Sequence, residues 1–414
     1  MNERPRIRDD AALLEAVQRQ TFRYFWDFAH PVSGLARERS NGDPDVVTTG
    51  GSGFGFMAIV IAAERGWISR DDAIDHLLKS LRFLEKAASY HGVMPHWLNG
   101  TTGAIIPFSR KDDGGDLVEA SYFIAGLLCA RQYFSRGGRE AELRSRINRL
   151  WREVEWNWHV REAGNVLYWH WSPNNGWSLN LPIRGWNECL ITYVLAASSP
   201  TYHAPPRVYH RGWTGGRDFA NGCTYFDDFL LPLGPDFGGP LFFAHYSFLG
   251  LDPRGLSDNY ANYWDQNVSH SLINHAYCVE NPKGFRGYGP ACWGLTASDN
   301  FEGYNAHSPT NDLGVITPTA ALSSMPYTPD ESLAALRHFY HGLGDRIWGE
   351  YGFTDAFCET RDWYAQSYLA IDQGPILIMI ENHLTGLIWD LFMSCPEVRS
   401  GLAELGFRST RLIA

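Results

Sequence analysis

The chain has 414 residues, of which 44% are hydrophobic and 20% charged, so it can bury a large core and lacks the composition of a disordered protein. Its formal net charge of −11, with 35 Lys and Arg against 46 Asp and Glu, argues against nucleic acid or an anionic membrane surface as a partner. A neutral substrate suits this charge balance better.

Helical periodicity runs along the whole chain, and strand-like alternation is confined to short pieces of the loops, so we predict an all-α fold. Ser69 and Asp72 form a capping-box signal before a one-sided helix. A second clean start is Thr328, followed by Pro329 at the first helical position. We predict about a dozen helices, with starts near residues 11, 53, 70, 116, 138, 186, 240, 260, 315, 329, 374 and 396.

The predicted helices are of two kinds. The segments 54–63, 122–130, 191–197 and 376–391 are apolar nearly all round and must be covered on several sides, whereas others, such as 143–158, have one apolar face. This alternation predicts an (α/α)6 barrel, a toroid of six inner and six outer helices. We find no linker or shift in composition, so residues 1–414 are expected to form a single domain.

Aromatic residues make up 14% of the chain and include 16 Trp and 20 Tyr. For any single ring a place in the core is the simpler explanation. However, the run from Tyr168 to Trp171, with Trp177 in the same loop, is typical of sugar-binding platforms, because the C–H faces of sugars stack on such rings. The long loops 160–185, 201–240 and 282–313 are expected to gather at the barrel mouth and form a carbohydrate cleft.

One acidic segment runs from Arg110 to Glu119. Asp112 and Asp113 fall in a loop, whereas Asp116 and Glu119 are three residues apart and share a face near the start of a helix. Carboxylates at that place also cap the open N–H groups of the helix. The pattern therefore leaves a structural and a functional role equally open.

Two further acids precede very apolar helices. Glu188 follows Gly185-Trp186-Asn187, which favours a side chain that points into a cleft; as a general acid it would need burial beside Trp186 to raise its pKa. Asp372 stands before Pro375, where it is either a cleft residue or a plain N-cap. Glu381 is either a cleft residue or the buried partner of an Arg. Turn chemistry explains the remaining loop acids better: Asp252, Asp258 and Asp299.

No cofactor or metal is expected. The seven cysteines are scattered without a CxxC pair, so buried free thiols are the expectation. His338 and His341 share a helix with neither HExxH nor a nearby Cys or Glu to complete a ligand set. Gly53 to Ala58 imitates a dinucleotide-binding loop, but the glycines are better explained by close approach of a buried helix to its neighbours.

The chain resembles the bacterial β-1,2-glucanases of glycoside hydrolase family 144, whose domain is labelled "putative glucoamylase". The matching stretches occur in order along nearly the whole sequence: 21–26, 48–54, 110–116, 185–188, 237–245 and 371–375. The resemblance implies an (α/α)6 barrel, an anomer-inverting mechanism and linear β-1,2-glucan as substrate. It also implies that Glu188 is the general acid and that Asp112, Asp116, Glu119 and Asp372 lie in or near the cleft.

We therefore predict an endo-β-1,2-glucanase in which Glu188 protonates the glycosidic oxygen while a second carboxylate activates water. Asp372 is the first choice for that base and Asp116 the second, at the separation of roughly 6.5–9.5 Å that inversion requires. Seven residues are expected to bind substrate: Asp112, Glu119, Arg110, Trp186, Trp177, Trp363 and His245.

Two alternatives remain open. An exo-acting enzyme that releases the disaccharide sophorose would use the same residues, and a non-catalytic glucan-binding protein would share the scaffold. The chain is expected to be a monomer whose partner is an oligo- or polysaccharide. The N-terminal residues 1–10 lack the apolar region of a secretory signal, so the expectation is cytoplasmic, or periplasmic if a leader has been removed.

Overall fold

The computed structural model describes residues 6–412, so residues 1–5 of the segment considered for a signal lie outside the described part. The protein is largely helical, as predicted. The α-helices are α1 (Asp10–Trp26), α2 (Thr49–Glu64), α3 (Arg70–Leu84), α4 (Leu117–Tyr133), α5 (Arg139–Glu153), α6 (Leu190–Ser198), α7 (Pro206–Arg211), α8 (Phe242–His245), α9 (Tyr263–Glu280), α10 (Pro318–Ser323), α11 (Pro329–Arg337), α12 (Gly344–Ile347), α13 (Ala370–Leu384), α14 (Leu387–Met393) and α15 (Pro396–Glu404).

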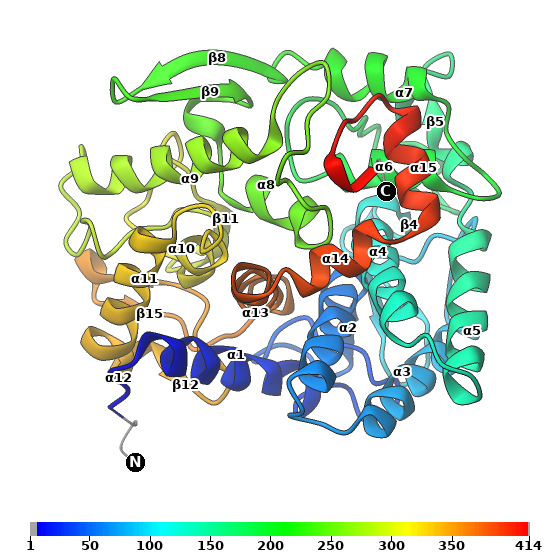
Figure 1. Ribbon diagram of the computed structural model, residues 1–414, viewed down its shortest axis with the longest axis horizontal. Coiled ribbons are helices and arrows are strands. Elements are labelled where there is room, and N and C mark those ends of the chain that lie inside the picture. The colour runs from blue at the N-terminus through cyan, green and yellow to red at the C-terminus, as the bar shows by residue number, and fades with distance from the viewer. Residues whose placement is uncertain (1–5, 413–414) are drawn as a thin grey trace.

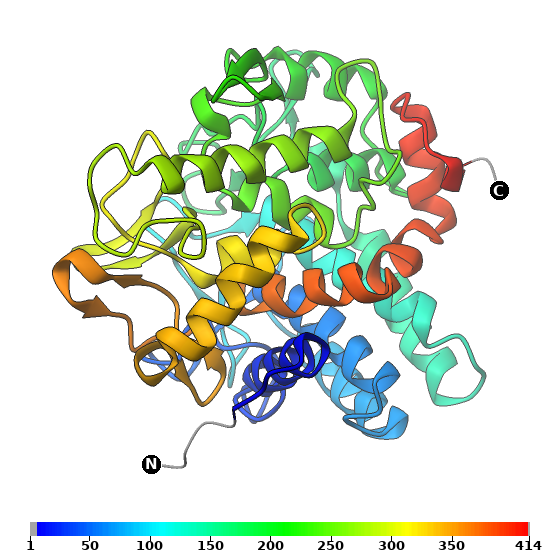
Figure 2. The same cartoon turned by 60° about the vertical axis from the view of Figure 1, so that its left-hand side comes forward.

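Helices with buried faces all round alternate along the chain with amphipathic ones. All described residues of α6 and α10 are buried, and α2, α4 and α13 are buried over nearly their whole length. By contrast, α3 and α5 bury one face only. In Figure 1 α13 lies near the middle of the molecule, while α1, α3, α5 and α9 lie at its periphery, and Figure 2 shows α5 and α9 on the outside from a second direction.

Glycines permit the closest packing between two central helices, α2 and α4. A Cβ atom on Gly53 would stand 2.3 Å from the carbonyl oxygen of Tyr122, and one on Gly126 would stand 2.1 Å from the carbonyl oxygen of Gly53. Only the absence of a side chain allows backbones to approach so closely. The explanation of the Gly53 segment as a helix-packing device is therefore confirmed.

The strands are short and lie in the connections between helices. A three-stranded antiparallel sheet contains β1 (Val46–Thr48), β2 (Trp97–Asn99) and β3 (Ile105–Ile106). The remaining strands form antiparallel pairs: β4 (Gly115–Asp116) with β7 (His170–Trp171), β5 (Val160–Arg161) with β6 (Val166–Leu167), β8 (Ala220–Tyr225) with β9 (Phe229–Leu233), β10 (Ala297–Asn300) with β11 (Gly303–Ala306), β12 (Trp348–Gly349) with β13 (Gly352–Phe353), and β14 (Phe357–Cys358) with β15 (Trp363–Tyr364).

The helix starts at Arg70 and Pro329 agree with the predicted signals. The Ser69 side chain accepts a hydrogen bond from the Asp72 N–H, as a capping residue should. Thr328 precedes α11 but makes no side-chain cap; its hydroxyl donates to the Ser324 carbonyl oxygen instead. Helix α11 is followed directly by a π-helical turn, His338–Gly342.

Several predicted boundaries are wrong. Helix α2 begins at Thr49 rather than near residue 53, and α5 ends at Glu153 rather than at residue 158. Helix α13 begins at Ala370 and contains Pro375 in its interior, so Asp372 lies in the first turn and is not an N-cap. The helix predicted at 186 begins at Leu190, because Gly185 adopts φ +80° and the residues after it form a turn. The predicted continuation of α13 to residue 391 breaks at Gly386, which has φ +75°.

Glu381 is the buried partner of an arginine, one of its two expected roles. Its carboxylate is 1% exposed and accepts hydrogen bonds from Arg65 at 2.9 Å, Gln18 at 3.1 Å and Thr385 at 2.7 Å. These donors satisfy the charge that burial would otherwise leave uncompensated. Glu381 therefore ties α13 to α1 and to the end of α2.

Within the described residues, no single helix is long and apolar enough to cross a membrane; α13 and α14 reach that length and composition only together, across a 90° bend.

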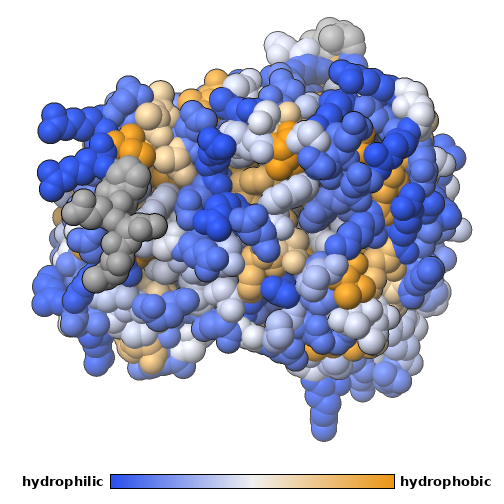
Figure 3. Space-filling view, turned by 90° about the horizontal axis from the view of Figure 1, so that it is seen from below, coloured by the Kyte–Doolittle hydropathy of each residue, from blue (hydrophilic) through white to orange (hydrophobic). Residues whose placement is uncertain are grey.

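Figure 3 shows the side of the molecule that is at the bottom in Figure 1, where α1 and α3 lie. This face is mostly polar, with small apolar groups between the polar ones. This surface matches the one-sided pattern of those two helices.

Candidate active site

A cavity of about 390 Å³ lies where the loops and the ends of the buried helices meet. A space of this size can hold a few sugar units, and its wall combines aromatic rings with acids, as carbohydrate sites do. The residues that line it are Glu38, Arg39, Thr48, His96, Trp97, Phe108, Val118, Glu119, Tyr122, Trp169, Glu188, Phe242, Tyr246, Ala297, Tyr304, Leu369 and Ile371.

Strand pairing brings the acidic segment to the aromatic loop. Gly115 and Asp116 in β4 pair with Trp171 and His170 in β7. Asp116 is the N-cap of α4, because its side chain accepts hydrogen bonds from the backbone N–H groups of Val118 and Glu119. Its other oxygen accepts from the Trp169 indole at 3.1 Å. Asp116 thus has the structural role left open by the sequence, and it also orients a ring in the cavity wall.

A histidine connects the two acids of this segment. The Nδ1 atom of His96 lies 3.4 Å from a carboxylate oxygen of Asp116, and its Nε2 atom lies 4.0 Å from a carboxylate oxygen of Glu119. Burial disfavours the charged imidazolium, but the negative charges of Glu119 and Asp116 outweigh it and raise the pKa of His96 to about 9. At neutral pH a cation therefore lies between two carboxyl groups at the cavity wall.

Glu119 approaches the start of α2 through a glycine. Its carboxylate accepts the Gly50 N–H at 2.7 Å, and a Cβ atom on residue 50 would stand 2.6 Å from the same oxygen. Burial raises the pKa of Glu119, whereas His96 and the Gly50 N–H oppose that rise. The Thr-Gly-Gly stretch at 49–51 thus makes room for an acid at the cavity.

Glu188 precedes α6, and its backbone is held on two sides. Its carbonyl oxygen accepts hydrogen bonds from the hydroxyl groups of Ser247 and Tyr122. The preceding Trp186 is 2% exposed and stacks on Tyr263, with 5.8 Å between ring centroids. The turn is therefore anchored in the core through Trp186, while the half-buried Glu188 lines the cavity.

The environment of Glu188 favours its protonated form. Burial raises the pKa of Glu188 to about 7, and the nearby charges of Asp116 and Glu119 act in the same direction. A hydrogen bond from the Glu188 backbone N–H to its own carboxylate opposes that rise, but burial outweighs it. A carboxylic acid that still carries its proton near neutral pH can act as a general acid.

A second acidic group lies near the cavity around Arg39. Arg39 donates to Glu38 at 2.8 Å and to Asp299 at 3.0 Å. Asp355, 2% exposed, accepts the Asp299 N–H at 2.7 Å, and Asp372, 1% exposed, lies against Asp355. Burial and the charge of Asp355 raise the pKa of Asp372 well above its ordinary value. Asp372 is therefore behind the cavity wall, in a buried pair of carboxyl groups.

The sequence matches a known protein family over about half of its length. The family model described as "Putative glucoamylase" matches residues 180–396, which include Glu188 and Asp372. The chain belongs to this family.

Two solved structures of family members overlay almost the whole chain. One is described as a putative glucoamylase from Bacteroides uniformis, with 58% identity, a TM-score of 0.97, and coverage of 98% of this chain and 100% of that one. The other is an endo-β-1,2-glucanase from Chitinophaga pinensis in complex with sophorotriose and glucose, with 53% identity, a TM-score of 0.95 and the same coverage. The family resemblance given by the sequence motifs is thus confirmed.

A curated relative is also similar over nearly the whole chain. It is the exo β-1,2-glucooligosaccharide sophorohydrolase (non-reducing end) of Parabacteroides distasonis, 46% identical over 418 aligned residues. The match covers 96% of this chain, which spans 58% of the length of that relative.

Of the seven residues expected to bind substrate, only Glu119 lines the cavity of this family member. Trp186 and His245 are 2% and 1% exposed; His245 lies 2.9 Å from the Ser324 hydroxyl, and burial lowers its pKa to about 3. Both are core residues, because apolar neighbours cover them. Trp177 packs on Trp158. Trp363 and Arg110 are also not part of the cavity wall.

Asp112 lies close to the site without lining the cavity. It lies 3.2 Å from the His170 imidazole. Burial and the charge of Asp116 raise the pKa of Asp112 to about 7. Asp112 and Glu188 therefore share two negative neighbours, Asp116 and Glu119.

Several wall residues were not predicted from the sequence. Phe108 and Tyr304 are 51% and 52% exposed, an uncommon state for large aromatic residues, and Phe108 stacks on His96 with 4.5 Å between ring centroids. Tyr246 and Phe242 stack at 5.1 Å. Phe242 and Tyr246 come from α8 and the turn that follows it, Tyr304 from β11 and Phe108 from a loop, so no single local motif predicts that these rings meet.

Proposed function

We propose that this chain is a glycoside hydrolase that cleaves linear β-1,2-glucan, with Glu188 as the general acid. The observation that carries the proposal is a half-buried Glu188 in an aromatic-lined cavity, with its pKa raised by burial to about 7. The names of two relatives, an endo-β-1,2-glucanase and an exo-acting sophorohydrolase, support the β-1,2 linkage.

We propose that water is activated by the acids around His96, with Asp116 as the base ahead of Asp372. Asp116 and Asp372 are both 1% exposed and neither lines the cavity. Asp116 is placed first because its charge, like that of Glu119, acts on Glu188, whereas Asp372 lies against Asp355. This reverses the order expected from the sequence, because a base must be ionised, and burial together with the Asp355 charge raises the pKa of Asp372 and favours its neutral form. The inverting course, with carboxyl groups roughly 6.5–9.5 Å apart or joined by a relay, stays part of the proposal.

The proposed architecture is the (α/α)6 barrel. It is supported by the alternation of buried helices, α2, α4, α6, α10 and α13, with amphipathic helices between them. In such a barrel the cavity lies at the mouth, where inner helices begin. Asp116 is the N-cap of α4, and Glu188 stands two residues before the first residue of α6. A single domain over residues 1–414 fits the same arrangement.

Endo action is the better-supported mode. The chain covers the whole of the Chitinophaga endo-glucanase structure at 53% identity, but 58% of the exo-acting relative at 46%. Exo action is the second candidate, because that relative matches 96% of this chain.

Chromatography of early products tests the function and the mode together. Incubation with β-1,2-, β-1,3-, β-1,4- and α-1,4-glucans is expected to yield new reducing ends from the β-1,2-glucan alone, as sophorooligosaccharides of several lengths. Release of sophorose alone would establish exo action. Thermal stabilisation by the glucan without new reducing ends would contradict hydrolysis and support a binding protein.

A further inference from the structure

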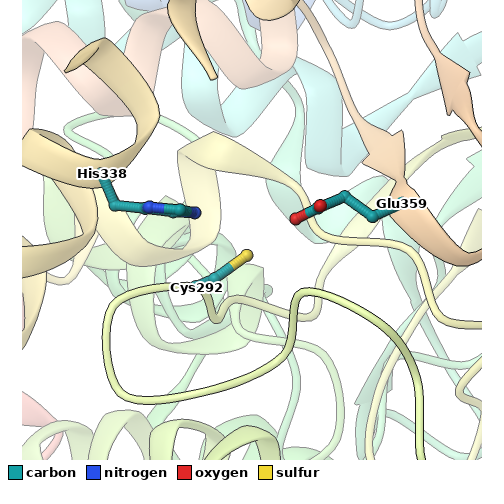
Figure 4. Close-up of side chains that lie close together, drawn as sticks. All are labelled: Cys292, His338 and Glu359. Carbon is teal, nitrogen blue, oxygen red and sulfur yellow. The ribbon is translucent and has the colours of Figure 1, made fainter. Parts of the chain in front are cut away.

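A histidine, a cysteine and a glutamate far apart in the sequence meet outside the cavity. The ligand atoms of Cys292, His338 and Glu359 all lie within 4.8 Å of one another, and Figure 4 shows the three side chains directed toward a common point. None of the three lines the cavity described above. The sequence argued against a metal because His338 has no Cys or Glu nearby along the chain, and folding supplies both.

The three side chains lack other polar partners among the described residues. The His338 Nε2 atom is buried without a hydrogen bond. The Cys292 thiol is free and the residue is 3% exposed. No ion pair in the described part of the chain involves the Glu359 carboxylate, although Glu359 is half-buried. Buried polar atoms normally find partners, so an unpartnered His338 Nε2 that faces a free thiol and a carboxylate points to a ligand shared by the three.

The backbone holds each ligand in place. Cys292 lies in a tight turn, with its N–H 3.0 Å from the Gly289 carbonyl oxygen. His338 opens the π-helical turn after α11, and such turns occur often at functional sites. Glu359 follows β14, and a Cβ atom on Gly287, which has φ +94°, would stand 2.2 Å from its carboxylate oxygen. The loop before Cys292 is thus shaped around the Glu359 carboxylate.

We propose that Cys292, His338 and Glu359 bind a zinc ion that ties together the loop before β10, the turn after α11 and the turn after β14. One sulfur, one nitrogen and one oxygen ligand suit zinc, whereas calcium and magnesium take oxygen ligands. Zinc ligands stand about 2.0–2.3 Å from the metal, so atoms at most 4.8 Å apart reach it by side-chain rotation. Half-burial of His338 and Glu359 leaves a fourth position for water.

The test is zinc uptake by the intact protein after treatment with a chelator and removal of excess metal. Elemental analysis is expected to give one zinc per chain, and zinc is expected to raise Tm, because a ligand bound only by the folded state stabilises it. Magnesium and calcium are expected to give neither effect. Cobalt(II) in place of zinc is expected to produce a thiolate-to-metal absorption band.

Matched variants separate this site from adventitious binding. Cys292→Ser and His338→Ala are expected to lower zinc affinity about 100-fold or more, since even residues that only orient a ligand cost 10–100-fold. Cys223→Ser and His341→Ala, which alter an exposed cysteine and an exposed histidine, are expected to bind zinc as the unmodified chain does. Glu359→Gln keeps the shape of the side chain and tests the carboxylate if the other variants unfold.

Equal zinc uptake by His338→Ala and His341→Ala, or a cobalt band that persists in Cys292→Ser, would overturn the proposal. So would loss of all zinc from the unmodified protein on gel filtration. The glucan assays play no part in this test, so its outcome is independent of the proposed hydrolase function.

Discussion

Replacement of Glu188 by Gln is expected to lower kcat on β-1,2-glucan by about 10²–10⁴-fold, the usual contribution of a positioned general acid. The amide has nearly the same shape but no acidic proton to give to the departing oxygen. The fold should persist, because the Glu188 backbone, not its side chain, accepts the hydrogen bonds of Ser247 and Tyr122. Initial rates of reducing-end formation measure the effect.

The control variant is Glu302→Gln, which makes the same chemical change in the turn between β10 and β11, outside the cavity wall. It is expected to keep full activity. Binding of sophorooligosaccharides to Glu188→Gln, measured by calorimetry, should stay close to that of the unmodified chain. Hydrolysis by Glu188→Gln at a rate within a few-fold of normal would remove Glu188 from the mechanism.

Asp116→Asn is expected to cause the second large loss, about 10²–10⁴-fold in kcat, because an amide cannot accept a proton from water. Asn is as good an N-cap as Asp, so α4 should still begin at Leu117. Loss of the Trp169 hydrogen bond is expected to cost about 1 kcal/mol of stability. Measurement of kcat reports the loss of catalysis, and urea unfolding of the same variant reports the loss of stability.

Asp372→Asn is the comparison that decides between the two candidate bases. Burial and the Asp355 charge raise the pKa of Asp372 well above its ordinary value and favour its neutral form, so Asp372→Asn is expected to retain far more activity than Asp116→Asn. If Asp372→Asn is inactive while Asp116→Asn works at a normal rate, the order first expected from the sequence is restored.

Local signals in the sequence predicted much of the helical framework. The cap at Ser69 and the start at Pro329 depend on neighbouring residues alone, and the structure confirms both helices. Pro375 misled the boundary of α13, because proline is expected in the first turn of a helix, whereas α13 begins at Ala370 and contains Pro375 in its interior. Tertiary packing, which no local pattern reports, decides that case.

The site was only partly predicted, because local motifs do not report contacts between distant segments. Glu188 and the 110–119 segment are marked by local motifs, and the structure places them at the same cavity. Trp186 and His245 lie beside motif residues but are turned into the core, and local sequence does not report such direction. His96 and the Cys292, His338 and Glu359 cluster depend on contacts between distant segments.

The most direct test of the central claim is the protonation state of Glu188 itself. A difference infrared spectrum between the unmodified protein and Glu188→Gln isolates the carbonyl band of the protonated Glu188 carboxyl group. We predict that this band is lost as the pH rises through about 7. A band that is already lost near pH 4.5, the ordinary pKa of a glutamate, would contradict Glu188 as an acid tuned by burial.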